Sequence, residues 1–214
     1  MPIIRIPQLV DLDALPRYEG VSPERILTPS TREAFRQAVD DIASYGQIGF
    51  DTESKPTFRV GEPSTGPHLI QFATPVTVYL FQVGADGCID AAKAVLESDQ
   101  VLKVGFGLSS DRSRLRSRLG IELRHFIDLG TTLRYAGKKG QVGLRGAVAA
   151  VLGTRISKSR SVSTSNWSNR TLTDAQRHYA ANDAHAALAI FLALGDAPET
   201  LLADRIQPAS ENQD

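Results

Sequence analysis

The chain has 214 residues, of which 42% are hydrophobic and 22% charged, a balance typical of one globular domain. Its single cysteine, Cys88, excludes an internal disulfide and suits a reducing compartment. The N-terminus lacks the basic and apolar regions of a signal peptide, and no apolar run approaches the roughly 20 residues that span a bilayer. We therefore expect a cytoplasmic protein with no membrane contact.

The formal net charge is zero, but the charges are unevenly distributed along the chain. Residues 101–170 hold 14 Lys and Arg against three acids, a net of +11, and the remainder holds 10 basic and 21 acidic residues, a net of −11. This asymmetry predicts a phosphate-binding surface beside an acidic site. The alternative is that the charges spread over the surface and form no patch.

The first elements are predicted from proline content and apolar periodicity. Residues 1–29 are interrupted by prolines and form an N-terminal extension. A helix is expected from Ser30, because Ser30 and Glu33 have capping-box spacing and apolar residues then recur with helical period. Gly46 ends this helix, and a strand follows over 47–51.

The middle of the chain alternates between loop, strand and helix patterns. The segment 54–67 is rich in Pro, Gly, Ser and Thr and is predicted to be a long loop. Two β-rich runs, 68–74 and 77–83, flank a proline and predict a hairpin. A helix over 89–98 and a short buried strand over 101–106 follow.

The C-terminal half is predicted to be mostly helical, with a Ser-, Arg- and Lys-rich loop over 153–170. Its regular elements are helices over 108–119, 131–135, 144–152 and 173–194 and a strand over 125–129. This order of elements predicts an α/β domain over 30–203 with a mixed five-stranded sheet flanked by helices. A polar tail over 204–214 follows.

Asp51 and Glu53 stand where an apolar strand passes into the long loop. Residues two apart on an extended chain point to the same side of a sheet. A carboxylate near a core stays charged only when it is paired or bound to a cation, and Mg²⁺ accepts such hard oxygen ligands. Taken alone, however, Asp-x-Glu is a weak signal, because surface pairs of this form are common.

Two more acids lie on separate elements. Asp111 follows a short strand and begins a helix, where a helix cap is the favoured explanation when the residue is taken alone. Asp183 lies inside the last helix, where Asp is disfavoured, and Tyr179 four residues earlier shares its side. Four acids on three elements would repel one another unless cations neutralise them. The lack of a Cys or His cluster favours two Mg²⁺ or Mn²⁺ ions over zinc.

Three segments together resemble the DEDD exonuclease superfamily, and most closely the branch of ribonuclease D and the Werner-helicase exonuclease domain. They are Asp51-Thr52-Glu53 with LIQF (69–72), VGFGLSSD (104–111) and SNWSNRTLTDAQRHYAANDAHAAL (165–188). The resemblance covers residues 30–195 and implies a ribonuclease-H-like fold. It also implies two-metal-ion hydrolysis of phosphodiester bonds at the 3′ end of RNA or DNA, either a single strand or the end of a duplex. The metal ligands it implies are Asp51, Glu53, Asp111 and Asp183, with Tyr179 orienting the attacking water.

Two positions depart from the pattern or fit it in two ways. Phe106 and Ser110 stand where many members carry Asn and an aromatic residue, so Asp128 is an alternative to Asp111, although its apolar context (FIDL) favours a structural role. His178 has the spacing of the histidine subclass and Tyr179 that of the tyrosine subclass; the context YAANDA favours Tyr179.

Basic and aromatic residues near the acids are candidate substrate contacts. Lys158 and Arg160 precede Trp167, a combination suited to binding phosphates and stacking a base, although the alternative for Trp167, a core or cap position under the last helix, is favoured. Lys55 and Phe58 lie in the loop that starts at the acids; this loop either wedges against the terminal base or is a disordered connection.

Two rival interpretations remain open: a nucleic-acid-binding module that has lost catalysis, and an α/β scaffold whose acids serve no chemistry. The sequence assigns no protein partner.

Overall fold

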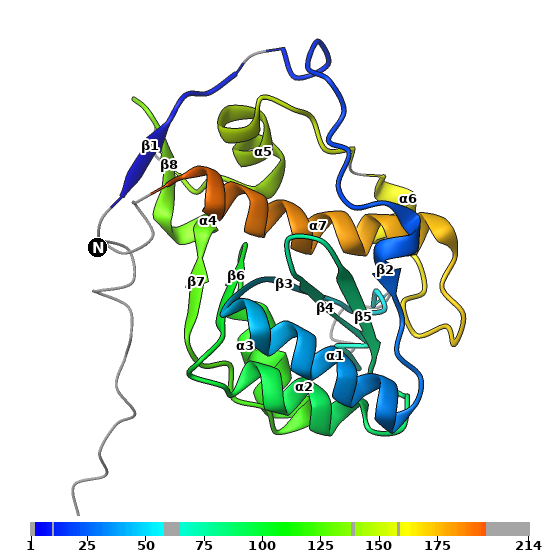
Figure 1. The fold of residues 1–214 in the computed structure, drawn as a ribbon. Helices are drawn as coiled ribbons and strands as arrows, with labels where there is room; N and C mark the ends of the chain where they lie inside the picture. The colour runs from blue at the N-terminus through cyan, green and yellow to red at the C-terminus, as the bar shows by residue number, and fades with distance from the viewer. Residues whose placement is uncertain (1–2, 10, 58–64, 138–139, 158, 196–214) are drawn as a thin grey trace, which may run out of the picture.

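The computed structural model describes residues 3–9, 11–57, 65–137, 140–157 and 159–195. A mixed sheet with the strand order β2-β5-β4-β3-β6-β7 forms the centre of the molecule (Figure 1). The strands are β2 (Ile26–Leu27), β3 (Gln47–Glu53), β4 (Leu69–Ala73), β5 (Val78–Gln82), β6 (Leu102–Gly105) and β7 (Phe126–Asp128). The five predicted strands are present, and the N-terminal segment adds a sixth, β2, at the edge.

The direction of each strand determines which ends meet. β4 runs antiparallel to both β3 and β5, forming the predicted hairpin, and β2 runs parallel to β5. β6 lies between β3 and β7 and runs parallel to both. Their C-terminal ends therefore lie at the same edge of the sheet, and the turns that leave them meet there.

Helices cover both faces of the sheet. α1 (Arg32–Tyr45), α2 (Cys88–Leu96) and α3 (Ser109–Arg114), which continues as a π-helical turn over Leu115–Leu119, lie on one face. α5 (Leu144–Leu152) and the long α7 (Asp174–Ala193) lie on the other, where α7 crosses the strands (Figure 1). Alternate residues of each strand point to opposite faces of the sheet. Ile48 and Phe50 pack in the core under α1 and α2, and Leu69 and Leu80 pack in the core under α7.

A second, two-stranded sheet joins the start of the chain to its middle. β1 (Ile4–Ile6) pairs in parallel with β8 (Leu133–Tyr135), and the 3₁₀-helix η1 (Pro23–Arg25) leads into β2. The predicted helix over 131–135 is therefore wrong. α4 (Leu129–Thr132) ends earlier, because the following residues pair with a strand that is far away in the sequence and invisible to a local pattern.

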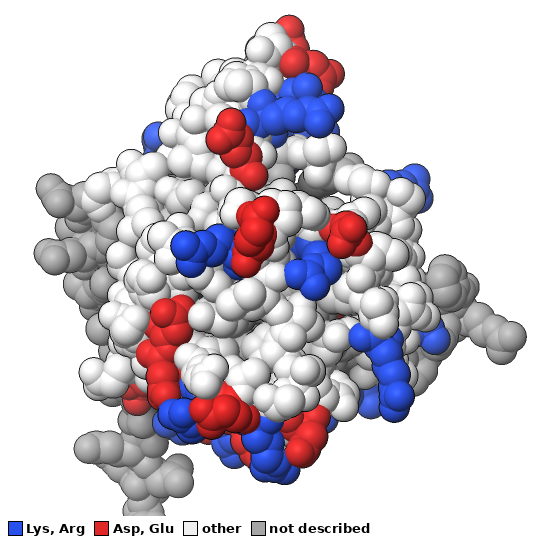
Figure 2. Space-filling view, turned by 45° about the vertical axis from the view of Figure 1, so that its right-hand side comes forward, with Lys and Arg blue, Asp and Glu red and all other residues white. Residues whose placement is uncertain are grey.

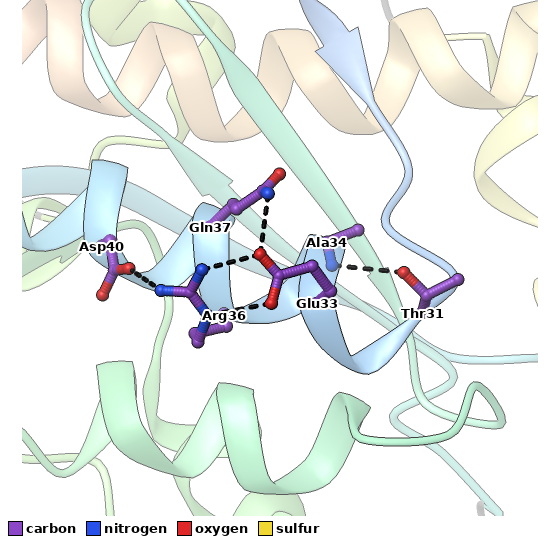
Figure 3. Close-up of polar contacts among 6 residues, drawn as sticks. All are labelled: Thr31, Glu33, Ala34, Arg36, Gln37 and Asp40. Atoms are coloured by element: carbon purple, nitrogen blue, oxygen red, sulfur yellow. Dashed lines mark hydrogen bonds and ion pairs between the residues drawn. The ribbon is translucent and has the colours of Figure 1, made fainter.

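The start of α1 also differs from the prediction by one residue. Thr31, not Ser30, is the N-cap, and its hydroxyl accepts a hydrogen bond from the Ala34 amide at 3.2 Å (Figure 3). Glu33 does not close a capping box, because its carboxylate accepts hydrogen bonds from Arg36 and Gln37 on the next turn. Arg36 also bonds Asp40, so the exposed side of α1 carries a local ion-pair network.

The Ser-, Arg- and Lys-rich segment is not entirely loop, because it contains the short helix α6 (Arg160–Ser163). The predicted tail over 204–214 lies outside the described residues. Within the described ranges, no helix combines the length and the hydropathy that crossing a bilayer requires.

Candidate active site

Three carboxylates from two elements converge at the C-terminal edge of the sheet. Asp51 and Glu53 come from β3 and Asp183 from α7, and one carboxylate oxygen of each lies within 4.8 Å of the others. Asp183 is buried, whereas Asp51 and Glu53 are partly exposed. We call these three residues the acid cluster.

The alternation of β3 and the close approach of α7 bring the acid cluster together. Gly49 lies on the side of β3 that faces α7, and a Cβ atom there would overlap the backbone carbonyl of Ala184. Asp51 and Glu53 follow at steps of two and so point to this same side. Because the glycine lets the helix lie directly against the strand, the neighbouring Asp183 reaches the two strand acids.

The first turn of α7 is fixed by a complete capping box. Thr173 Oγ1 accepts from the Gln176 amide at 3.2 Å, and Gln176 Oε1 accepts from the Thr173 amide at 3.0 Å. Gln176 Nε2 also donates to Ser165 Oγ at 2.9 Å, which ties the preceding loop to the helix. This network explains why Thr173 and Gln176 stand where they do in the motif over 165–188, and it sets the register of Tyr179 and Asp183.

Tyr179 faces the acid cluster from the turn of α7 before Asp183. Burial raises the pKa of the Tyr179 phenol well above its ordinary value, and the charges of Asp183, Glu53 and Asp51, with a hydrogen bond to Asp183, add to the rise. The side chain is therefore a neutral hydroxyl at physiological pH. The imidazole of His178 instead has Nδ1 2.8 Å from the carbonyl oxygen of Asp174, on its own helix. The geometry thus places Tyr179 at the acids.

Asp111 lies beside the acid cluster but is not a member of it. Its carboxylate is buried and accepts a hydrogen bond from Thr52 Oγ1, the side chain between the two strand acids. Arg114 Nη1 lies 3.8 Å from Asp111 Oδ1. Burial raises the pKa of Asp111, although the Thr52 hydrogen bond and the charge of Arg114 act in the opposite direction. The predicted fourth acid is thus connected to β3 through Thr52.

Asp128, the alternative to Asp111, has a structural role. Its Oδ1 accepts from the amides of Gly107 and Gly130 at 2.9 Å each, and its Oδ2 accepts from the amide of Leu108 at 3.0 Å. The carboxylate therefore ties the turn after β6 to the start of α4, as its apolar context indicated.

The predicted substrate contacts lie in different environments. Trp167 is only 1% exposed, with Nε1 donating to the Ser163 carbonyl at 3.2 Å and its ring centroid 6.0 Å from that of Tyr179. This is the core position that the sequence left open as the alternative, so the indole offers no free face to a base. Lys55 and Arg160 are exposed, at the start of the long loop and of α6. Phe58 and Lys158 lie outside the described residues.

Sequence reasoning missed three residues that shape the site. Thr52 donates a hydrogen bond to the Asp111 carboxylate, and Gly49, which has no side chain, allows α7 to pack closely against β3. Gln71 on β4 pairs with Asp51 across the sheet and is fully buried, and among the described residues its amide has no hydrogen-bond partner. A small residue inside an apolar strand was the available signal for Gly49; nothing local singled out the other two.

The acid cluster suits a hard divalent cation. Three carboxylates with ligand oxygens inside 4.8 Å of one another form an all-oxygen donor set, with neither Cys nor His among them. Carboxylate oxygens are the ligands that Mg²⁺ and Mn²⁺ prefer, whereas zinc sites favour nitrogen and sulfur. The residues present therefore fit the predicted ion class.

The predicted basic surface is absent from the side of the molecule drawn in Figure 2. There, basic and acidic side chains are interspersed and separated by uncharged surface. Any gathering of the positive charges of residues 101–170 must lie elsewhere on the molecule.

Comparison with known proteins points to one family. Residues 26–197 match the family described as 3′-5′ exonuclease. The mouse bifunctional 3′-5′ exonuclease/ATP-dependent helicase WRN is 31% identical over 167 residues, covering 77% of this chain and 12% of the relative. Ribonuclease D of Xanthomonas oryzae pv. oryzae is 29% identical over 146 residues, covering 67% of this chain and 38% of the relative.

Solved structures share the fold. The EXO domain of Aedes aegypti Nibbler superposes with a TM-score of 0.72 at 25% identity, covering 87% of this chain and 98% of that domain. Trypanosoma brucei RNase D, solved in complex with RNA U12, superposes with a TM-score of 0.66 at 20% identity, covering 88% of this chain and 74% of that one. The match over residues 26–197 includes the acid cluster, Asp111 and Tyr179, and the chain belongs to the 3′-5′ exonuclease family.

Proposed function

We propose that the chain hydrolyses phosphodiester bonds at the 3′ end of a nucleic acid with two divalent cations, Mg²⁺ or Mn²⁺. Asp51, Glu53 and Asp183 hold the cations, and Asp111 supplies a fourth carboxylate. The observation that carries this proposal is the convergence of the acid cluster, with Tyr179 against it. The chain spans only 12% and 19% of two of the curated relatives, WRN and the human exonuclease 3′-5′ domain-containing protein 2, so the proposal concerns this domain's own chemistry.

The protein residues have distinct tasks in this reaction. Bound divalent cations lower the pKa of the attacking water and stabilise the charge on the leaving oxygen. The neutral Tyr179 hydroxyl orients the attacking water beside the acids, because its raised pKa keeps it protonated. The Thr52–Asp111 hydrogen bond holds the fourth carboxylate against the strand that carries Asp51 and Glu53.

The substrate class in the proposal is a strand with a free 3′ hydroxyl. The complex of T. brucei RNase D with RNA U12 supports RNA as one substrate, and the likeness to the WRN exonuclease keeps DNA as the other candidate. Discrimination between the two depends on contacts to the 2′-hydroxyl.

The proposal is tested with matched RNA and DNA strands labelled at the 5′ end. In Mn²⁺ or Mg²⁺, the wild-type protein should produce a ladder of products shortened from the 3′ end. A strand with a blocked 3′ end should resist, and Asp183→Asn should be inactive. A circular dichroism spectrum that matches wild type shows that this variant is folded.

The rival function is a binding module without catalysis. If the protein binds labelled strands but does not shorten them at any Mg²⁺ or Mn²⁺ concentration, the chain is a binding module and not a nuclease. Shortening that persists in the chelator EDTA would contradict the metal requirement.

A further inference from the structure

An open groove with two arginines lies on the α3 side of the sheet edge, apart from the acid cluster. It has a cavity volume of about 750 Å³ between the helical segment 109–119 and the strand β7 with the start of α4. Ser109, Arg112 and Arg116 line one wall, and Glu122 and Phe126 line the other. The proposed reaction uses none of these side chains.

The arginines are held in place but keep free donors. The Arg112 guanidinium lies over the Phe126 ring, with Cζ 5.4 Å from the ring centroid. Arg112 Nη2 and Arg116 Nε each lie 3.7 Å from a carboxylate oxygen of Glu122, which is longer than a hydrogen bond. The Arg112 and Arg116 side chains remain 47% and 79% exposed. Their N–H groups are therefore available to an anionic ligand in the groove.

Strand register places one end of this groove at the sheet edge that carries the acid cluster. Asp128, at the end of β7, lines the cavity and pairs with Gly105 at the end of β6. β6 lies directly beside β3, which carries Asp51. Neighbouring strands are about 4.8 Å apart, so two strand spacings, roughly 10 Å, separate Asp128 from β3 across the sheet. The two arginines lie farther from the acids, beside Phe126 at the start of β7 and on the face of the sheet opposite to α7. A strand of several nucleotides that ends at the acids must therefore pass over the C-terminal edge of the sheet to reach them.

We propose that this groove binds the phosphate backbone of the substrate strand, upstream of the terminal nucleotide. The inference rests on the proposed function for its ligand. The planar guanidinium group of arginine can donate two parallel hydrogen bonds to the oxygens of one phosphate. Ser109 adds a hydroxyl group to the same wall of the groove. Such contacts are independent of base sequence and set affinity for long strands. Arg112 and Arg116 belong to the positively charged segment 101–170, so part of its excess positive charge lies in this groove.

The test compares a long strand with a substrate too short to reach the groove. The probe for binding is a fluorescent single strand of 20 nucleotides in EDTA. The probe for chemistry is the p-nitrophenyl ester of thymidine 5′-phosphate with Mn²⁺. The double variant Arg112→Ala/Arg116→Ala should raise the Kd of the strand about tenfold. Loss of two phosphate contacts should also reduce the slope of log K against log salt by about 1.4. Hydrolysis of the small ester should stay at the wild-type rate.

Two further variants make the result specific. Glu122→Gln removes the carboxylate that competes for both arginines and should tighten strand binding. Arg36→Ala removes an exposed arginine on α1, outside the groove, which is paired with Glu33 and Asp40, and should change neither probe.

An unchanged Kd in the double variant would overturn the proposal, as would an equal loss of ester hydrolysis. A wild-type protein that binds the strand through the arginines but hydrolyses no ester would contradict the proposed function and leave the groove standing.

Discussion

Tyr179 has its hydroxyl against three carboxylates, and burial together with their charge keeps it protonated. We expect Tyr179→Phe to lower kcat on a labelled strand about 100-fold, because the water loses the group that orients it. The matched variant His178→Ala should stay within about twofold of wild type, since its Nδ1 lies against the Asp174 carbonyl oxygen on its own helix. The measurement is the single-turnover rate of strand shortening at saturating Mn²⁺ for wild type and both variants. Loss of turnover in His178→Ala with a near-normal Tyr179→Phe would reverse the assignment.

In the proposed two-ion site, Asp111 is the residue on which the second cation would depend. The acid cluster alone supplies three carboxylates, and Asp111 approaches it through Thr52. We expect calorimetry to find two Mn²⁺ per wild-type chain and one per chain in Asp111→Asn. Two ions in the variant would show that this carboxylate is a structural partner of Thr52 and not a ligand.

Lys103 is a fully buried lysine away from the site, and it predicts a pH dependence of stability. Its Nζ donates to the carbonyls of Ser98 and Val101 at 2.6 and 2.8 Å, and burial lowers its pKa to about 7. Between that value and the unfolded pKa of 10.5 the folded chain binds fewer protons than the unfolded chain, so the contribution of Lys103 to stability rises with pH.

The measurement for Lys103 is the free energy of unfolding in urea of wild type and Lys103→Met between pH 7 and 9. The difference, wild type minus variant, should rise by about 1 kcal/mol per pH unit. Groups remote from Lys103 titrate equally in both proteins and cancel in the difference, and His125, whose pKa burial and the charge of Lys103 lower from its ordinary value, titrates mostly below this window. A flat difference would show that the lysine stays charged in the fold.

At the scale of elements, the packing of α7 on β3 positions the site. We expect Gly49→Ala to cost about 1–3 kcal/mol of unfolding free energy, because the new methyl group meets the backbone of α7. Mn²⁺ affinity should fall as well, since the helix moves Asp183 away from Asp51. Gly84→Ala is the control, because a Cβ there meets nothing within 4 Å. If Gly49→Ala is destabilised but binds Mn²⁺ as tightly as wild type, the packing of α7 on β3 does not determine the position of Asp183 in the metal site.

Elements with a strong local pattern were predictable, and those that depend on a distant partner were not. The long α7 has a continuous helical pattern, and β3 has an apolar run that ends in acids, so both were found from the sequence. β2 and β8 are two and three residues long and form only because β5 and β1 lie beside them. The one-residue difference at the start of α1 arose because Ser30 and Thr31 are both good caps, and only geometry selects between them.

At the scale of the whole molecule, the site depends on segments far apart in the sequence meeting at one sheet edge. The sequence predicted the acids of that edge because burial of unpaired carboxylates is costly and because the three motifs were recognisable together. It did not predict that Thr52 would link Asp111 to β3 or that Trp167, in its core position, would lie beside Tyr179. Those features depend on side-chain directions in three dimensions, which motif spacing does not encode.

The central claim is that Asp51, Glu53 and Asp183 form one site for divalent cations. Its most direct test is the melting temperature of wild type and of Asp51→Asn/Asp183→Asn with increasing Mn²⁺. At a Mn²⁺ concentration 100 times Kd, binding should stabilise the wild-type fold by about 2.7 kcal/mol, which raises Tm by roughly 5–10 °C. The account predicts that rise in wild type and none in the double variant. The same rise in both proteins, or none in wild type, would contradict it.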